Sequence, residues 1–170
     1  MGAIRLRARP CAQSRGWETR DLYEAIEWAG KQPWSNGEVG MSGISYYSIN
    51  QWLVASLQPP HLAAIAPREG AADMYRDVTR HGGIFSNTFP MLWFQRQVLP
   101  VQHGNGQSPL RDLDDGAPIG GERSLAPEQL AANRGVLVEE ILRRPLDGPW
   151  YRERSGDFSK IDVPLLSGAN

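Results

Sequence analysis

The stretch Glu38-Val-Gly-Met-Ser-Gly-Ile-Ser-Tyr-Tyr-Ser-Ile-Asn-Gln-Trp52 contains the pattern that decides the fold. Its first part, residues 38–42, is short and mostly apolar, as expected of a strand buried in a parallel sheet. A turn at residues 43–47 follows. Residues 46–57 then predict a helix, which the proline pair after it ends. The central prediction for this part of the chain is therefore a turn that leads directly from a buried strand into a helix.

Flanking segments supply further elements of the same kind. A second short apolar run at residues 62–67 predicts the next strand, and residues 161–167 predict a third. The strand–helix–strand order is typical of a parallel sheet in an α/β protein. Upstream, Asp21 and Glu24 have the spacing of a capping box, which predicts a helix that begins there and ends near Pro33.

Ser45 has the sequence context of a nucleophilic serine. A serine hydroxyl needs a base to remove its proton and a donor to stabilise the oxyanion that forms. A sharp strand-to-helix turn exposes the hydroxyl and directs the next backbone N–H, that of Tyr46, toward the developing charge. Gly43 is small, as the crowded turn requires, whereas Tyr47 stands where the common G-x-S-x-G pattern has glycine. The alternative is a serine that merely caps the following helix.

The segment around Ser45 resembles the nucleophile segment of the cocaine-esterase and Xaa-Pro dipeptidyl-peptidase family of α/β-hydrolases. That family carries G-x-S-Y-x-G at the elbow, often with Gln-Trp further along the helix. The matching positions are Gly43, Ser45, Tyr46, Gln51 and Trp52, and Ser48 replaces the last glycine. The resemblance continues through residues 28–34, 66–67, 73–76 and 161–167, so it covers most of the chain from Gly16 onward.

The resemblance implies a serine hydrolase that cleaves an ester or an amide, as an esterase, an acylase or a peptidase that cuts on the C-terminal side of an Xaa-Pro unit. Its substrate would be a small-molecule ester or a short peptide. Ser45 would attack the carbonyl carbon and the Tyr46 N–H would hold the oxyanion. The family's second oxyanion donor, its catalytic aspartate and its histidine fall outside this chain, which is expected to be a central segment of a longer hydrolase. The alternative is a non-catalytic, truncated fragment that lacks the aspartate and the histidine.

The expected fold is a partial α/β-hydrolase, with a parallel sheet, a nucleophile elbow and an inserted helical cap. An irregular segment at residues 1–15 precedes a core part at 16–72. The helical cap is expected at 73–155, where a helix should begin near Pro127, and the chain returns to a core strand at 156–170. Sheet edges left without neighbouring strands favour self-association, so a homo-oligomer, or partial folding of this piece made alone, is expected.

Composition argues against several classes of partner. Lys and Arg number 18 against 19 Asp and Glu, a balance that does not favour binding to nucleic acid or to an anionic membrane. No apolar run has the length of a membrane span. Cys11 is the single cysteine, which favours a reducing, cytoplasmic setting without disulfides. The sequence implies neither a cofactor nor a metal ion.

Other polar residues are given structural interpretations. The histidines are His61, His81 and His103, and none occupies the place of the family's base. His81, beside a Gly-Gly pair, could serve as a substitute base or contact the substrate, but an ordinary loop histidine is the preferred interpretation. For Asp73, Asp77 and Arg80 a role as metal ligand or acid is the alternative, but their spacing favours a solvated charged helix face. The aromatic residues from Phe85 to Phe94 would line a substrate pocket or pack inside the cap.

Overall fold

The computed structural model describes residues 15–98, 113, 114, 116, 126–132 and 137–169. The chain divides into two compact units. The first, called the sheet unit below, contains residues 15–85 and 146–170, and the second, called the helical unit, contains residues 1–14 and 86–145. Each is described by itself. The division predicted at residues 16–72, 73–155 and 156–170 stays a prediction.

The sheet unit contains helices and short strands in alternation. In chain order these are α1 (Arg15–Gly30), β1 (Val39–Ile44), α2 (Tyr46–Ala55), β2 (Leu62–Arg68), the π-helical turn η2 (Met74–Thr79), β3 (Arg80–His81), β4 (Ile84–Phe85), α7 (Pro149–Arg152) and the 3₁₀ turn η4 (Phe158–Lys160). The helical unit contains α3 (Thr88–Trp93), the π-helical turn η3 (Phe94–Val98), α5 (Pro127–Ala132) and α6 (Leu137–Leu142).

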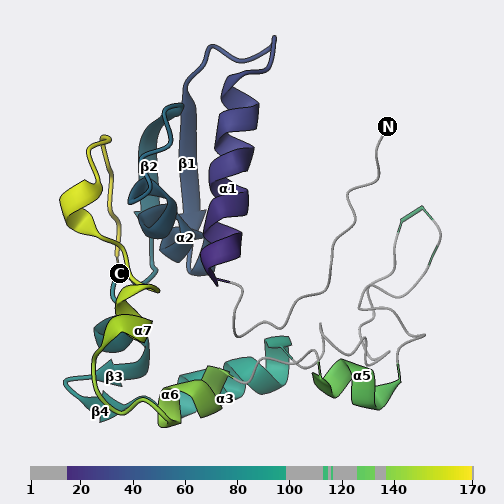
Figure 1. Cartoon of the computed structure of the whole chain (residues 1–170), viewed down its shortest axis with the longest axis vertical. Helices are drawn as coiled ribbons and strands as arrows, with labels where there is room; N and C mark the ends of the chain where they lie inside the picture. Colours follow the sequence, from purple (N-terminus) through teal and green to yellow (C-terminus); the bar gives the residue numbers. More distant parts are fainter. Residues whose placement is uncertain (1–14, 99–112, 115, 117–125, 133–136, 170) are drawn as a thin grey trace. The chain divides into compact units, whose positions relative to one another are not determined.

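A parallel sheet forms the centre of the sheet unit (Figure 1). β1 and β2 run parallel, with Met41 opposite Ile65, and α2 connects them. The chain returns to the other side of β2 near its C-terminus, where parallel bridges join Ile65 to Leu165 and Arg68 to Gly168. The predicted α/β architecture and parallel sheet are therefore confirmed, and the predicted third strand pairs with β2 through these two bridges.

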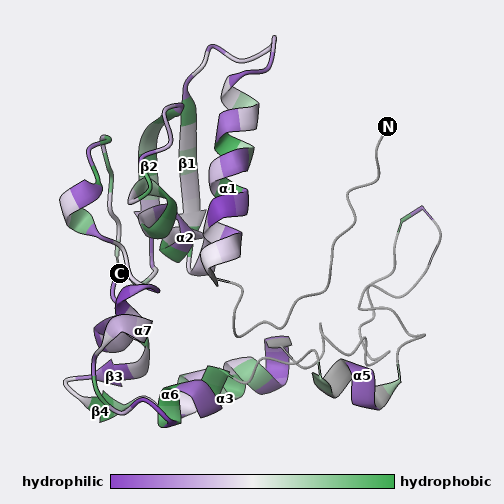
Figure 2. Cartoon of the chain, viewed as in Figure 1, coloured by the Kyte–Doolittle hydropathy of each residue, from purple (hydrophilic) through white to green (hydrophobic). Residues whose placement is uncertain are grey.

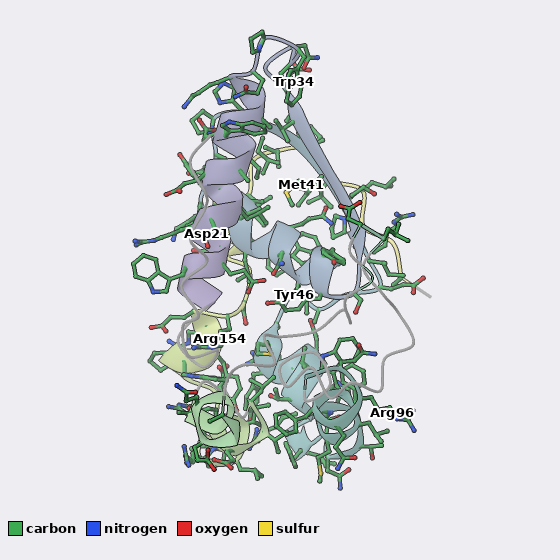
Figure 3. The ribbon with its side chains drawn as sticks, turned by 90° about the vertical axis from the view of Figure 1, so that its right-hand side faces the viewer. Asp21, Trp34, Met41, Tyr46, Arg96 and Arg154 are labelled. Carbon is green, nitrogen blue, oxygen red and sulfur yellow. The ribbon has the colours of Figure 1, made fainter. Side chains whose placement is uncertain are left out.

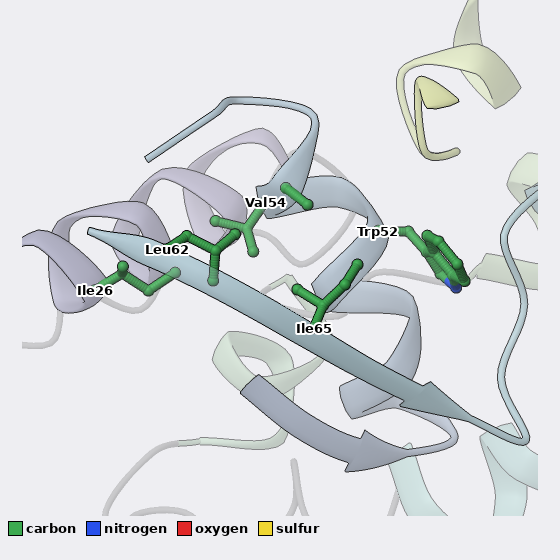
Figure 4. Packing of buried hydrophobic residues seen from close by; sticks show 6 residues of the cluster. Ile26, Trp52, Val54, Leu62 and Ile65 are labelled. Atoms are coloured by element: carbon green, nitrogen blue, oxygen red, sulfur yellow. The ribbon is translucent and has the colours of Figure 1, made fainter. Parts of the chain in front are cut away.

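The core of the sheet unit lies between helices α1 and α2 and strand β2 (Figure 4). Ile26 of α1, Val54 of α2 and Leu62 and Ile65 of β2 meet there, and each is at most 5% exposed. Full burial of one such side chain stabilises the folded state by about 1.5–3 kcal/mol. This cluster fixes α2 against β2, and it therefore fixes the turn that joins β1 to α2.

Helix α1 begins earlier than the capping box at Asp21 predicts. It starts at Arg15, and Asp21 lies exposed within it. The prediction of the start was wrong because Glu18 stabilises an earlier first turn, through its charge near the helix N-terminus and through a hydrogen bond from Tyr46. In Figure 2 the ribbon of α1 alternates between hydrophilic and hydrophobic residues, as expected of a helix with one face on a core. Among the described helices, none combines the length and the apolar character needed to span a bilayer.

Arg80 is buried, which corrects its assignment to a solvated face. Only 5% of it is exposed, and its Nη1 donates to the Tyr151 hydroxyl at 3.1 Å. The guanidinium also lies 5.8 Å from the centre of the Tyr75 ring and 5.4 Å from that of Phe85. The spacing of charges along the chain could not reveal this, because Tyr151 joins from a segment 71 residues away.

The two aspartates near Arg80 organise the backbone of η2. The Asp73 carboxylate accepts from the Arg76 N–H at 2.8 Å and so caps η2. The Asp77 carboxylate accepts from the N–H groups of Ala72 and Asp73, at 2.9 Å each. Both carboxylates therefore hold the turn in place, which agrees with a structural interpretation.

In the helical unit, α5 begins at Pro127 as predicted, and Ile141 of α6 is fully buried. The rings of Phe89 and Trp93 on α3 lie 5.7 Å apart and are 57% and 44% exposed. These two residues are therefore not core residues of the cap, contrary to one of the two interpretations of this aromatic segment.

Candidate active site

Ser45 lies at the turn between β1 and α2 with an unusual backbone conformation. Its φ is 60° and its ψ is −120°, in a region that side-chain-bearing residues rarely adopt. Such a conformation costs about 1–3 kcal/mol and persists only where the surroundings impose it. Ser45 is exposed, and its hydroxyl makes no hydrogen bond that caps α2. A strained, exposed serine at a strand-to-helix turn has the local geometry of a nucleophile elbow.

Backbone hydrogen bonds hold this conformation from both sides. The Ser45 N–H donates to the Arg68 carbonyl at the end of β2, at 3.1 Å. The Ser45 carbonyl accepts from the N–H groups of Ser48 and Ile49 in α2, at 2.9 and 3.1 Å. The elbow is thus tied to the neighbouring strand on one side and to its own helix on the other.

Small residues provide the space that the turn needs. A Cβ atom on Gly43 would lie 2.6 Å from Cβ of Tyr47, which is closer than real Cβ atoms approach. A Cβ atom on Gly70 would lie 2.3 Å from the hydroxyl of Ser48, which is itself 1% exposed. Ser48 therefore fits in place of the family's last glycine because Gly70 faces it, and the side chain of Tyr47 fits because Gly43 has none.

Tyr46 contributes both its backbone and its side chain to the turn. Its N–H belongs to the first turn of α2, where N–H groups point toward the N-terminal end and create a positive field. Its hydroxyl donates to Oε2 of Glu18 on α1 at 2.6 Å. Figure 3 shows Tyr46 at the end of β1 where α2 begins, with Trp34 beyond the opposite end. This partner of the Tyr46 side chain was not predicted from the sequence.

Gln51 is a buried polar residue one and a half turns further along α2, with no exposed surface. Its Nε2 donates to the Tyr47 carbonyl at 3.0 Å, and its Oε1 accepts from the Ala66 N–H of β2 at 2.9 Å. In the sequence, Gln51 matches the family pattern, but no role was predicted for it. The available signal was an amide side chain within the apolar part of a helix, four residues after Tyr47.

His61 lies far from Ser45, at the opposite end of the sheet. It precedes β2, whose seven residues place its two ends about 20 Å apart, whereas the Ser45 N–H bonds to the last residue of β2. Nδ1 of His61 lies 2.9 Å from Oε2 of Glu27, and its N–H donates to Oε1 at 3.0 Å. The ring of His61 also packs tightly against Gly30, because a Cβ atom added there would overlap the ring. His61 therefore has a structural role.

The pKa of Glu27 reflects this pairing. Burial works to raise the pKa, but the hydrogen bonds from the backbone and ring of His61, its charge and a hydrogen bond from Lys31 together lower it below its usual value. His81 is exposed, and its Nε2 lies 2.6 Å from the Asp77 carbonyl in the same turn. His103 lies outside the described residues. Neither described histidine is brought to Ser45.

Comparison with known proteins extends these observations. The profile of the X-Pro dipeptidyl-peptidase (S15) family matches residues 11–170. A candidate serine esterase of Mycobacterium bovis is 37% identical over 183 residues, which cover 95% of this chain and 28% of that protein. The cocaine esterase of a Rhodococcus species is 41% identical over 56 residues, 33% of this chain and 10% of that protein. The chain thus spans little more than a quarter of the first relative's length.

Solved structures agree with the sequence comparisons. A CocE/NonD family hydrolase from Staphylococcus aureus superposes with a TM-score of 0.62 and 35% identity, over 88% of this chain and 22% of that one. An aminopeptidase from a marine sediment archaeon shares the fold, with a TM-score of 0.53 and 20% identity over 89% of this chain and 26% of that one. With a strained serine elbow on a parallel sheet and a family profile that matches nearly its whole length, the chain belongs to the X-Pro dipeptidyl-peptidase (S15) family.

Proposed function

We propose that the chain carries the nucleophile of a serine hydrolase that acts on ester or amide bonds. The observation that supports this most is the conformation of Ser45, whose φ of 60° and exposed side chain occur at a turn held by bonds to β2 and α2. A helix-capping serine needs neither feature, since a helix N-cap normally has extended backbone angles and bonds its side chain to the helix. The named relatives, which include a candidate serine esterase and a cocaine esterase, support the same chemistry.

In the proposed reaction, the Ser45 hydroxyl attacks the carbonyl carbon of the substrate. In the intact hydrolase, a histidine takes the hydroxyl proton and then returns it to the leaving alcohol or amine, and an aspartate orients that histidine. The Tyr46 N–H and the N-terminal field of α2 stabilise the oxyanion. Water then attacks the acyl-serine, which releases the acid and restores the hydroxyl.

Substrates of both proposed kinds test this function. The protein is incubated with a p-nitrophenyl ester and with an Xaa-Pro p-nitroanilide, and release of the chromophore is followed. In the intact hydrolase, which has the histidine and the aspartate as well, Ser45→Ala is expected to reduce kcat by at least about 10⁴-fold, as removal of a catalytic serine does. Ser42→Ala is the matched control, since Ser42 lies on β1 and is also exposed. Within the described part of the chain, its hydroxyl accepts a hydrogen bond from the Arg68 side chain and makes no other.

The relative rates on the two substrates distinguish an esterase from an Xaa-Pro peptidase. Turnover that is equal in the wild-type protein and in Ser45→Ala would contradict the proposal. Folded protein that cleaves neither substrate would instead favour a non-catalytic role for this chain.

A further inference from the structure

We propose that Gln51 is a positioning residue that holds the Ser45 elbow at a fixed place relative to β2. This inference rests on the proposed function, since it concerns the site at which Ser45 would react. It goes beyond that function because it assigns the geometry of the nucleophile to a side chain that touches neither Ser45 nor the substrate.

The contacts of Gln51 use both ends of its amide. Nε2 donates to the carbonyl of Tyr47 in the first turn of α2, and Oε1 accepts from the N–H of Ala66 within β2. The bonds measure 3.0 and 2.9 Å, and the side chain has no exposed surface. A single rigid amide thus joins the beginning of the helix to the strand beside it.

The same two elements hold Ser45. Its N–H is bonded to Arg68, two residues after Ala66 on β2, and its carbonyl is bonded to Ser48 and Ile49 of α2. A shift of α2 along β2 would therefore pull on Ser45 from both sides, and the Gln51 amide opposes that shift. Ser45 occupies a strained conformation that the surroundings must impose, so the position of these anchors matters at this turn more than at an ordinary helix start.

The packing around Gly43 supports the same conclusion. A Cβ atom there would approach Cβ of Tyr47 to 2.6 Å and Nε2 of Gln51 to 3.3 Å. The strand that leads into the elbow therefore carries no side chain at the point where the amide and Tyr47 pass. An apolar side chain at position 51 would fill the same volume, but it would leave the Tyr47 carbonyl and the Ala66 N–H, whose bonds to Gln51 are part-buried, without this partner, which is unfavourable.

Amide hydrogen exchange, measured residue by residue by NMR on the full chain, tests the clamp directly. In the wild-type protein, we expect the Ala66 N–H and the side-chain N–H₂ of Gln51 to exchange slowly. In Gln51→Met, which is nearly isosteric, we expect at least about tenfold lower protection at Ala66, Ser48 and Ile49. Protection at Ile65, whose N–H donates to the Pro164 carbonyl, should change much less.

Two further variants make the test specific. Gln32→Met is the matched control, because Nε2 of Gln32 also donates to the carbonyl four residues earlier, that of Trp28 at 2.8 Å, but at the end of α1. It should leave Ser48, Ile49 and Ala66 unchanged. Gln51→Glu keeps the acceptor for Ala66 and loses the donor to Tyr47 when ionised. It should preserve protection at Ala66 and lower it at Ser48 and Ile49.

Reaction with a fluorophosphonate then connects the clamp to reactivity. We expect Gln51→Met to label at Ser45 about 10- to 100-fold more slowly than wild type, as small displacements of a reacting group do, and Gln32→Met to label at the wild-type rate. Fast exchange at Ala66 in the wild-type protein, or unchanged protection at Ser48 and Ile49 in folded Gln51→Met, would overturn the role of Gln51. A wild-type protein that does not label at Ser45 would instead contradict the proposed function, while the exchange data would still decide whether Gln51 holds the elbow.

Discussion

Ser45 combines an exposed hydroxyl with a backbone conformation that favours glycine. At φ 60° and ψ −120° the serine side chain is strained, yet β2 and α2 hold it there by hydrogen bonds. Selection for stability alone would favour glycine at this position. The strain therefore supports the proposal that Ser45 is kept for its hydroxyl, in line with the common conflict between stability and activity at functional sites.

Replacement of Ser45 by glycine is expected to stabilise the fold relative to Ser45→Ala. Glycine relieves strain of about 1–3 kcal/mol and loses part of it to its greater freedom in the unfolded chain, which leaves a gain of about 1 kcal/mol. Alanine keeps the strain and also lacks the hydroxyl, so it is the matched control. Urea denaturation measures the free energy of unfolding, and equal values for the two variants would show that the backbone at this turn is relaxed.

Two glycines of β1 should differ sharply in their tolerance of alanine. Gly43→Ala places a Cβ atom 2.6 Å from that of Tyr47 and is expected to cost about 1–3 kcal/mol through overpacking. Gly40→Ala, on the same strand, meets no atom within 4 Å and should change stability by less than about 0.5 kcal/mol. Chemical denaturation of both variants checks the difference, and a tolerant Gly43 would mean that Tyr47 is not held against β1.

At the level of elements, sequence patterns predicted the buried strands and the helix between them because these depend on local hydrophobic spacing. β1, α2 and β2 all lie within two residues of their predicted ranges. Partners from distant segments could not be predicted in the same way. The bond from Tyr46 to Glu18, the burial of Arg80 against Tyr151 and the link from Gln51 to Ala66 all depend on which elements come together in space.

The attachment of α1 to the start of β2 should weaken in acid. The pKa of Glu27 lies below its ordinary value of 4.5 in the folded protein, so folding favours the ionised carboxylate. This contribution is complete above about pH 4.5 and is lost as the pH falls through the lowered pKa. Glu27→Gln should therefore flatten the decline of stability with pH in this range.

Thermal melts between pH 3 and pH 6 measure this difference, with the ionic strength held at about 0.1 M so that screening stays constant. Parallel curves for the wild-type protein and Glu27→Gln would contradict the assigned role of the pair formed by Glu27 and His61.

Two arginines near η2 differ in burial and should differ in their effect on stability. Arg80→Met removes a buried bond to Tyr151 and two ring contacts, and is expected to cost about 2–3 kcal/mol. Arg76→Met removes ion pairs to Asp73 and Asp147 from a side chain that is 62% exposed, and its effect should be much smaller. Equal free energies of unfolding for the two variants would show that Arg80 does not join residues 73–85 to the segment that contains α7.

For the whole molecule, the family follows from the agreement of the elbow, the sheet and the profile match over residues 11–170. The candidate nucleophile could be identified from the sequence because a strand–turn–helix with a small residue before the serine is a local pattern. The rest of a triad could not be assigned in the same way, since the chain spans only 28% of the first relative's length. Neither of the two described histidines takes the place of a base, because each is bonded to a neighbouring group away from Ser45.

The central claim is that Ser45 is a reactive nucleophile, and covalent labelling tests it most directly. The intact hydrolase is treated with a fluorophosphonate, its mass is measured, and the adduct is located by peptide mapping. We predict one adduct per chain on Ser45, no adduct in Ser45→Ala, and an unchanged adduct in Ser42→Ala. A folded protein that carries no adduct, or carries it on another residue in both the wild type and Ser45→Ala, would contradict the claim.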